Sequence, residues 1–553
     1  MRKSLSLILV LAMLLSVALP VLGSAEGAVA DGVYTTTCHG FYGDFELSMT
    51  IEQGAIAAFD YSGNVETPEL GGAALEMMSE AMIAANTSGV DSVSGATVTS
   101  AVFRSAVNTM LREIGAPDSM MAAPAKGEPA TETLETDVLV IGAGAAGLAA
   151  ASGAAESGAR VILLEKQDII GGSFVTSAGI VYAAMDESDV DTMVAYYMDR
   201  ANGNASEELL RFYAENSMDT IAWLEGLGVQ WFMTVPAGTA AEPRAHFAMD
   251  ENGRWMSGAV MSSKILAHLE ELGVEVLTGT PATELLTDET GAVVGATAVC
   301  DNVTYTINAG AVILATGGYD ASSEMKALYA PTAVTDFPLS SKGNTGDGIN
   351  MGIAVGAATE FKGGMIGFDF VDGSLPESGY NAVAMYCNSY VQPDGTFVSD
   401  VIDYPITYQA IKDLGVEHFY GLYDAAGEQT VAAAMARGFA WKGETVEELA
   451  AATGMDAEKL ADAIEQGTGL ESAPYFAVMV KPCTIGSMGG LVIDTDAQVL
   501  STDGTPIAGL YASGEVANGA FYDKEYPASG SSNSISMTYG LEAGRNAAAY
   551  AGK

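Results

Sequence analysis

Residues 137–165 follow the order strand, glycine-rich turn, helix and strand, which leaves few folds open to this chain. Residues 137–141 are almost continuously apolar, as in a buried parallel strand, and the turn that follows has the spacing G-x-G-x-x-G. The second strand, residues 160–164, ends in an acidic side chain. Such a turn brings backbone N–H groups close to a pyrophosphate, and the acid suits a ribose hydroxyl. The pattern predicts an α/β fold that binds a dinucleotide through Gly142, Gly144, Ala146, Gly147 and Glu165.

Four further glycine-containing segments resemble one known family. They follow Glu165, end the apolar strand 311–315, occupy residues 343–348 and end the segment 509–515. They resemble the fumarate reductase and succinate dehydrogenase flavoproteins, a family that includes urocanate reductase and 3-ketosteroid dehydrogenases, over residues 133–553. The Gly-Gly pair soon after the acid resembles the FAD enzymes rather than the NAD enzymes. The resemblance implies non-covalent FAD, held in addition by Lys166, Gly171, Gly172, Ser173, Thr316, Gly317, Gly318, Asp347, Gly514 and Glu515.

A serine-rich segment, residues 531–535, begins the last predicted helix. Free N–H groups at a helix N-terminus stabilise negative charge, so this end would face the flavin pyrimidine oxygens, where charge accumulates on reduction. Ordinary N-capping by the same serines needs no ligand and is the alternative explanation. The expected flavin contacts are Ser531, Ser532, Ser534 and Ile535.

Residues 91–97, Asp-Ser-Val-Ser-Gly-Ala-Thr, precede another predicted helix. Small residues there let an anion approach the helix N–H groups, although ordinary N-capping explains the same composition. Residues 31–114 resemble the FMN-binding domain of extracytoplasmic flavoproteins and of a sodium-pumping quinone reductase subunit, and the motif D-x-x-[ST]-G-A-[TS] matches completely. The resemblance implies FMN joined to Thr97 as a phosphoester by a separate flavin transferase, beside Ser94, Gly95 and Ala96.

The first 30 residues have the pattern of a bacterial secretory signal. A basic start precedes an apolar run from Leu5 to Leu19, and small residues follow. The run of about 15 residues is shorter than the ~20 that a membrane-spanning helix needs, so an uncleaved anchor is the less favoured interpretation. We expect the mature protein to be secreted or held outside the cytoplasm at the cell surface.

The charge and the metal-ligating residues exclude several functions. With 70 acidic and 23 basic side chains, the formal net charge is −47, which repels nucleic acids and offers no polybasic contact to lipid headgroups. The four cysteines are scattered without a C-x-x-C motif, and the four histidines are dispersed. These spacings argue against a metal site and against covalently attached haem. We expect neither a metal nor haem.

Composition and motifs together predict six parts. Residues 1–30 are the signal, 31–114 an α+β FMN-binding domain and 115–132 a proline-rich linker. Residues 133–360 and 486–553 form a Rossmann-like FAD-binding domain, into which an α+β capping domain for the substrate is inserted at 361–485. Because the sequence has no haem motif, FMN would receive electrons from a membrane donor and pass them to FAD.

The predicted substrate site departs from that of the fumarate reductases, which use arginines for carboxylates. The sequence has no arginine between Arg254 and Arg437, and Ser529 stands near the position of the family's clamping arginine. Tyr404 occupies, within one residue, the position of the family's acid arginine. Tyrosine and serine do not form the bidentate carboxylate pair that arginine forms, so fumarate is disfavoured.

The segment from Tyr526 to Gly530 resembles the Y-x-x-x-G motif of the 3-ketosteroid dehydrogenases. The resemblance implies that the Tyr526 hydroxyl and the Gly530 N–H polarise a ketone oxygen, where negative charge builds during hydride transfer. Tyr404 would then protonate the α-carbon. A tyrosine packed in a turn and an ordinary core aromatic are the alternative explanations for Tyr526 and Tyr404.

These features predict a flavin-dependent oxidoreductase that acts on CH–CH groups in anaerobic respiration. Electrons would pass from FMN to FAD and then to the C=C bond of a small α,β-unsaturated carbonyl compound other than fumarate. Two alternatives are a dehydrogenase of the 3-ketosteroid type and a fumarate- or urocanate-type reductase with an unusual site. A pure electron carrier is disfavoured, because a carrier needs no closed, water-free pocket.

Overall fold

The computed structural model describes residues 29–41, 43–125, 127–249, 258–371, 387–399, 404–436 and 438–553. Residues 1–28, which hold most of the predicted secretory signal, lie outside these ranges. The chain divides into two compact units: one takes in the chain up to Glu66, Leu75–Asp91 and Thr99–Pro124, and the other takes in Thr67–Ala74, Ser92–Val98 and Ala125–Lys553. None of the described helices combines the length and the apolar character needed to cross a membrane.

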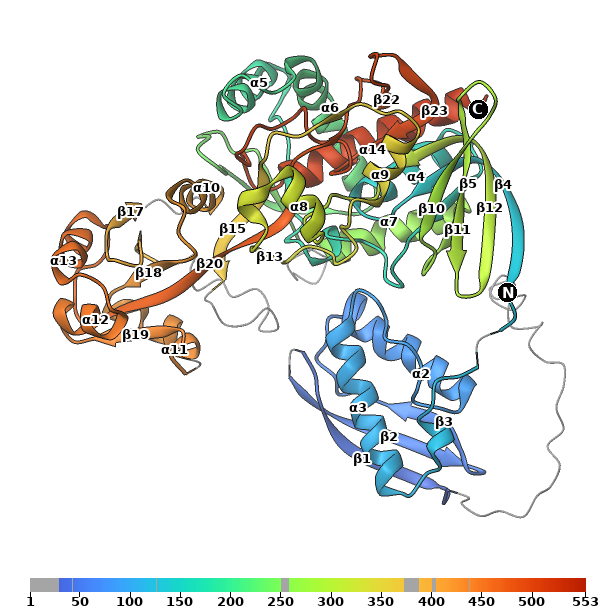
Figure 1. The fold of residues 1–553 in the computed structure, drawn as a ribbon, viewed down its shortest axis with the longest axis horizontal. Helices are drawn as coiled ribbons and strands as arrows, with labels where there is room; N and C mark the ends of the chain where they lie inside the picture. The colour runs from blue at the N-terminus through green and yellow to red at the C-terminus, as the bar shows by residue number, and fades with distance from the viewer. Residues whose placement is uncertain are drawn as a thin grey trace. The chain divides into compact units, whose positions relative to one another are not determined.

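The first unit is built on a three-stranded antiparallel sheet, with strand order β1-β2-β3 (Figure 1). Side chains of β2 alternate between buried and exposed, as expected for a sheet with one face on a core. Phe103 of α3 is fully buried, and its ring lies edge-on to Phe59 of β3 with 5.3 Å between centroids. The elements are β1 (Gly32–His39), β2 (Asp44–Glu52), β3 (Ala55–Asp60), α2 (Ala73–Ala85) and α3 (Thr97–Glu113).

The second unit is built on an eight-stranded sheet with the path β10-β11-β12-β4-β5-β9, and β23 pairs with both β12 and β22. The inner strands pair in parallel, whereas β10, β11 and β22 form antiparallel pairs. The apolar end of β4 is at most 4 % exposed, which fits a strand covered on both faces. The bounds are β4 (Ala130–Ile141), β5 (Val161–Leu164), β9 (Glu275–Leu277), β10 (Ala282–Thr287), β11 (Val293–Cys300), β12 (Val303–Leu314), β22 (Gln498–Leu500) and β23 (Pro506–Ala512).

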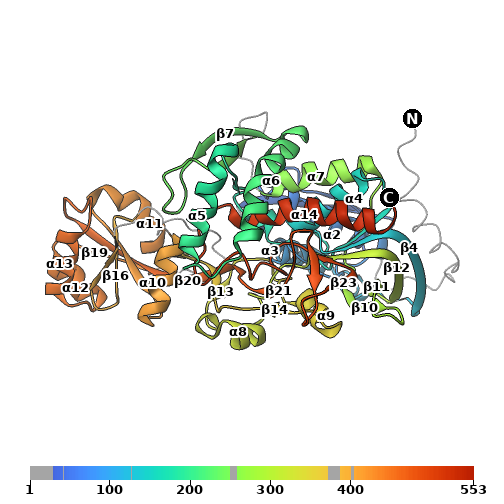
Figure 2. The same ribbon diagram turned by 90° about the horizontal axis from the view of Figure 1, so that it is seen from above.

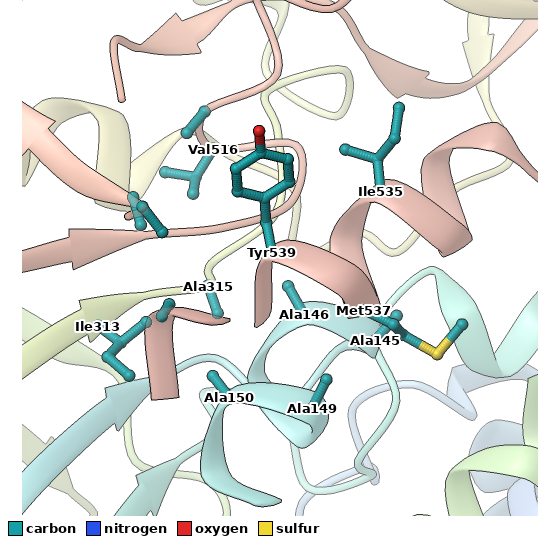
Figure 3. Packing of buried hydrophobic residues seen from close by; sticks show 14 of the residues in the cluster. Ala145, Ala146, Ala149, Ala150, Ile313, Ala315, Val516, Ile535, Met537 and Tyr539 are labelled. Atoms are coloured by element: carbon teal, nitrogen blue, oxygen red, sulfur yellow. The ribbon is translucent and has the colours of Figure 1, made fainter. Parts of the chain in front are cut away.

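Two helices, α4 (Ala145–Glu156) and α14 (Ser531–Tyr550), pack closely beside this sheet. A Cβ on Gly153 of α4 would lie 2.5 Å from the Leu541 carbonyl oxygen, and one on Gly544 of α14 would lie 2.2 Å from the Ala150 carbonyl oxygen. Figure 3 shows alanine side chains of α4 beside Met537 and Tyr539 of α14. The small residues therefore let the two backbones touch.

A second layer consists of three helices and a small antiparallel sheet of order β6-β8-β7. Helix α6 packs against both α5 and α14. The Ser206 side chain caps α6 by accepting a hydrogen bond from the Leu209 N–H. The bounds are α5 (Val190–Arg200), α6 (Glu207–Gly226), α7 (Gly258–Leu272), β6 (Val181–Tyr182), β7 (Gln230–Val235) and β8 (Ala245–Met249).

The long strand β20 (Tyr475–Ser487) is the central strand of a separate seven-stranded sheet. Its first half pairs with β18 and β19, and its second half pairs with β13 and β15. Figures 1 and 2 show β16–β19 and α11–α13 gathered at one end of the second unit. The bounds are β13 (Phe337–Pro338), β15 (Met365–Val371), β16 (Ser389–Val391), β17 (Phe397–Ser399), β18 (Phe419–Tyr423), β19 (Ala440–Gly443), α10 (Tyr404–Leu414), α11 (Glu428–Ala436), α12 (Val446–Thr453) and α13 (Ala457–Gln466).

Much of this end of the unit falls within the predicted capping domain, whose exact limits stay a prediction. Two short helices and a two-stranded sheet complete the α-helices and strands of the described residues. They are α8 (Ser323–Tyr329), α9 (Asp347–Ala354), β14 (Thr359–Glu360) and β21 (Gly490–Leu491).

Replacing Gly544 with alanine tests the contact between α4 and α14. The added methyl group would meet backbone atoms of Ala150, which cannot rotate away, so we expect a loss of about 1–3 kcal/mol in the free energy of unfolding. Gly226→Ala is the control, because a Cβ at the end of α6 meets nothing within 4 Å. Denaturant unfolding of both variants at equal flavin content measures the difference, and equal stabilities would contradict the close contact.

Candidate active site

The glycine-rich turn after β4 leaves an open space beside its second glycine. Gly142 has φ +103°, and a Cβ there would lie 2.4 Å from the Ala315 carbonyl oxygen. A Cβ on Gly147 would lie 1.7 Å from the Gly142 carbonyl oxygen, so only glycine fits there. A Cβ on Gly144, by contrast, would meet nothing closer than the Gly171 carbonyl oxygen at 3.9 Å. This space at the N-terminus of α4 suits a pyrophosphate.

Glu165 stabilises the turn through both of its carboxylate oxygens. Its Oε2 accepts a hydrogen bond from the Ala143 N–H at 2.9 Å, and its Oε1 accepts one from the Gln167 N–H at 2.8 Å. Burial raises the pKa of Glu165, and these N–H groups oppose the rise. Each oxygen keeps a second lone pair, so the same carboxylate can still accept from a ribose hydroxyl.

Side chains that are distant in the sequence meet beside this turn. Lys166 Nζ donates to Asp347 Oδ2 at 2.7 Å. The Ser173 hydroxyl oxygen accepts from the Ser341 N–H and from the Asn344 side-chain amide, both at 3.1 Å. Lys166 and Asp347, both predicted cofactor contacts, therefore largely neutralise each other. The Glu165 carboxylate, hydroxyl groups and backbone groups remain as polar contacts for a cofactor.

Two buried hydroxyls near the glycines have no hydrogen-bond partner among the described residues: Thr316 Oγ1 and Ser262 Oγ. Thr316 precedes Gly317, which has φ +73°. A Cβ on Gly171 would lie 3.2 Å from the Ser262 hydroxyl. Because a buried hydroxyl without a partner is costly, both atoms fit the polar groups of a bound FAD. The sequence does not single out Ser262, since a serine early in a helix is ordinary composition.

Glu515 is a carboxyl that burial keeps protonated near neutral pH. It lies against Gly318 and Gly486, where added Cβ atoms would approach its oxygens to 2.8 Å and 2.4 Å. It accepts a hydrogen bond from the Ser487 N–H at 3.2 Å. Burial, and after it the charge of Asp320, raises the pKa of Glu515 to about 8. Asp320 is itself fully buried with a raised pKa, so the pair does not carry two full charges.

A tyrosine hydroxyl caps the N-terminus of α14 by accepting a backbone hydrogen bond. Gly530, with φ +91°, precedes the helix, and the Ser532 N–H donates to the Tyr526 hydroxyl oxygen at 2.8 Å. Burial raises the pKa of Tyr526, and backbone hydrogen bonds from Ser532 and Gly530 oppose the rise. The structure thus brings Tyr526 and Gly530 together at the positive end of the helix dipole. The first turn is buried or half-buried at Ser531, Ser532, Ser534 and Ile535.

More tyrosines and one arginine are buried around this helix end. The Tyr197 hydroxyl donates to Ser531 Oγ at 2.6 Å, and the Tyr197 and Tyr213 rings lie edge to face with centroids 5.8 Å apart. Arg244 is fully buried and forms two hydrogen bonds to Asp189, at 2.6 Å and 2.7 Å. The guanidinium charge is therefore balanced inside the protein, and the surroundings of α14 are phenolic rather than cationic.

Tyr404 is the first residue of α10, and its side chain lies outside the described part of the structure. One turn later, the buried Tyr408 donates to Asp336 Oδ2 at 2.8 Å. Lys412 forms an ion pair with the same carboxylate, and Lys326 Nζ donates to the Asp336 carbonyl oxygen at 2.9 Å. The role of Tyr404 as a proton donor stays a prediction.

The predicted FMN motif forms the start of a long helix in the structure. Thr97 is the first residue of α3 and is exposed, and Gly95 has φ +97°. Ser94 and Ala96 are half-buried. The Thr97 hydroxyl is therefore accessible at a helix N-terminus, where backbone N–H groups stabilise a phosphate.

Two family models match this chain. A model described as an FAD binding domain matches residues 137–366 and 407–532, and one described as an FMN-binding domain matches residues 40–112. The first match covers more than half of the sequence. The chain therefore belongs to the FAD binding domain family of flavoproteins and carries an FMN-binding domain in addition, as the motifs predict.

Three relatives of this chain with 29–30 % identity are reductases. Urocanate reductase of Eggerthella lenta is 29 % identical over 96 % of this chain and 94 % of that protein. A probable fumarate reductase of Shewanella frigidimarina is 30 % identical over 75 % of each. The vinyl phenol reductase of Lactiplantibacillus plantarum is 29 % identical over 75 % of this chain and 96 % of that protein.

Solved structures agree with this family. The open conformation of a flavocytochrome c3 fumarate reductase matches 76 % of this chain and 79 % of its own, with 29 % identity and a TM-score of 0.62. A 3-ketosteroid-Δ4-(5α)-dehydrogenase from Rhodococcus jostii RHA1 matches 77 % of this chain and 100 % of its own, with 24 % identity and a TM-score of 0.65, and shows the fold alone. The predicted α/β class is confirmed, and the chain is a flavin-dependent oxidoreductase that acts on CH–CH groups.

The raised pKa of Glu515 predicts a pH dependence of stability. The folded protein keeps a proton that the unfolded chain releases near the ordinary value of 4.5, so stability is lost as the pH rises through about 8. We expect the thermal midpoint of the wild type to fall more steeply between about pH 5 and 8 than that of Glu515→Gln. Glu46→Gln, at an exposed position of β2, is the control, and parallel curves for wild type and Glu515→Gln would contradict the raised pKa.

Proposed function

We propose that this protein is an extracytoplasmic reductase that passes electrons from covalently bound FMN through FAD to the C=C bond of a neutral α,β-unsaturated carbonyl compound. The choice of substrate class rests on the ion pairs that the arginines form with carboxylates inside the protein. The structure describes five arginines in the second unit, and each forms an ion pair with a carboxylate: Arg160–Asp137, Arg200–Glu525, Arg211–Asp191, Arg244–Asp189 and Arg545–Glu542.

A dicarboxylate such as fumarate needs cations that are free to hold it. Within the described ranges, any arginine that took this role would have to leave its present carboxylate. If Arg244 left this pair, the buried Asp189 carboxylate would lose its partner. Breaking a buried ion pair in this way costs about 3–5 kcal/mol of stability. Arg254 and Arg437 lie outside these ranges. The arrangement favours an uncharged substrate.

The residues at the start of α14 suit the charge that develops in such a reduction. FAD, when bound and reduced, supplies a hydride to the β-carbon of the alkene. Negative charge then builds on the carbonyl oxygen, and a donor placed there lowers the barrier. The Tyr526 oxygen accepts from the Ser532 N–H, so its own O–H remains to donate to the substrate. Tyr404 is the proposed donor of the proton to the α-carbon.

The FMN-binding domain supplies the electron entry in this proposal. The sequence has no motif for covalent haem, and the FMN motif is complete at Thr97, which is exposed at the start of α3. A membrane donor would reduce FMN, and a flavin transferase would attach it during maturation. The signal-like residues 1–30 support a location outside the cytoplasm, where NADH is scarce.

A dehydrogenase that works in the opposite direction is the second candidate. Tyr526 and the N-terminus of α14 would polarise a ketone oxygen equally well during desaturation. Assays with a saturated ketone and an oxidised dye, beside assays with an enone and a reduced viologen, distinguish the two directions.

Thr97→Ala should abolish covalent FMN. Protein made together with a flavin transferase is expected to gain the mass of one FMN phosphoester, and acid precipitation should release its FAD but not its FMN. Thr109→Ala, a change of another hydroxyl of α3, should keep the adduct. Intact-mass measurement makes the test, and an adduct that survives in Thr97→Ala would place the covalent link elsewhere.

The wild type should reduce a neutral enone in preference to fumarate. Each missing charge-assisted hydrogen bond to a carboxylate costs about 1.5–3 kcal/mol, so two missing bonds lower kcat/KM for fumarate by about 10²-fold or more. Oxidation of a reduced viologen with benzalacetone or with fumarate as the acceptor measures the ratio. Brisk fumarate reduction would contradict the proposed substrate class while leaving the flavoprotein assignment in place.

A further inference from the structure

The hydroxyl of Tyr522 is buried without a hydrogen-bond partner among the described residues. The whole residue is 1 % exposed. A buried phenol normally finds a partner, because the unmade hydrogen bond is not replaced by water. An unpartnered phenol that persists in a folded protein therefore points to a ligand that supplies the missing acceptor.

Tyr522 lies next to the residue that polarises the substrate in the proposed function. Tyr522 precedes Tyr526 by four residues, and the two ring centroids are 5.8 Å apart. The pKa of Tyr522 is raised by burial and by the neighbouring Tyr526, Tyr213 and Glu515. The phenol therefore keeps its proton at neutral pH.

The segment that carries both tyrosines is held at its two ends. Lys362 Nζ donates to the carbonyl oxygens of Gly519 and Tyr522, both at 2.9 Å. At the other end, the Tyr196 hydroxyl donates to the Pro527 carbonyl oxygen at 2.6 Å. These bonds fix the backbone on each side of Tyr526, so both phenols keep defined positions before a substrate arrives, as an oxyanion site requires.

The donors at the start of α14 are unequal in what they can offer a ligand. The Ser532 N–H donates to the Tyr526 oxygen at 2.8 Å and is therefore already engaged. Two hydroxyls near this helix end are buried without a partner among the described residues, Tyr522 Oη and Ser534 Oγ, and the Tyr522 ring contacts that of Tyr526.

We propose that the Tyr522 hydroxyl donates a hydrogen bond to the carbonyl oxygen of the substrate, as a second phenolic donor beside Tyr526. This inference rests on the proposed reduction of a neutral enone. Two neutral O–H donors stabilise a carbonyl oxygen that gains charge only during hydride transfer. The two phenols carry no positive charge that could compensate the carboxylate of a bound acid, so the same pair selects neutral ketones and aldehydes over acids.

The test compares Tyr522→Phe with the wild-type holoenzyme. Removing the hydroxyl should lower kcat/KM for benzalacetone at least tenfold and weaken the binding of the saturated product, benzylacetone, measured from the shift it causes in the oxidised flavin spectrum. The thermal midpoint without ligand should not fall, because the hydroxyl has no partner to lose among the described residues. A purely structural role would lower the midpoint instead.

Tyr539→Phe is the matched control. Its hydroxyl donates to the Leu209 carbonyl oxygen at 3.0 Å, so this variant should lose thermal stability and keep the wild-type kcat/KM. Unchanged enone kinetics in Tyr522→Phe would overturn the inference and leave the proposed function standing. A fall in the thermal midpoint as large as that of Tyr539→Phe would also overturn it. A wild type that reduces no enone would overturn the proposed function and this inference together.

Discussion

Direct backbone contact between α4 and α14 is the constraint on which the second unit depends. The contact exists because glycines at 153 and 544 leave no Cβ between the two helices. Gly540 meets the Ala146 carbonyl oxygen in the same way, at 2.5 Å from an added Cβ. Helix α4 begins at the glycine turn that suits a pyrophosphate, and α14 begins at the buried tyrosines. One helix–helix contact therefore ties the cofactor end of the unit to its proposed substrate end.

Charge pairing is the basis of the proposed substrate class. In a chain with 70 acidic and 23 basic side chains, carboxylates compete for every cation. The arginines of the second unit that the structure describes are all engaged with Asp or Glu, and Lys166 is engaged with Asp347. The polar groups at the start of α14 are phenols, serine hydroxyls and backbone N–H groups. These stabilise a developing partial charge better than a full resident charge.

Local motifs were predictable, whereas contacts between distant segments were not. The turn after β4 could be predicted because the G-x-G-x-x-G spacing reflects backbone contacts that leave no room for a side chain at Gly142 or Gly147. The Ser262 hydroxyl joins the same site from α7, and no spacing links it to the turn. Tyr526 was predicted from a five-residue motif. Tyr522 became a candidate only because its hydroxyl is buried and has no partner within the described part of the chain.

The sequence by itself determined the dinucleotide-binding α/β fold, because the G-x-G-x-x-G turn between two strands is a short motif that acts locally. Its resemblance to known families implied the FMN-binding domain and the enzyme class. Tertiary structure decided which of the named groups are available for chemistry. Lys166 and Asp347 neutralise each other, and Glu515 and Asp320 share a buried environment that raises both pKa values. The physical reason is that burial and partner choice depend on residues more than a hundred positions apart, which no local pattern encodes.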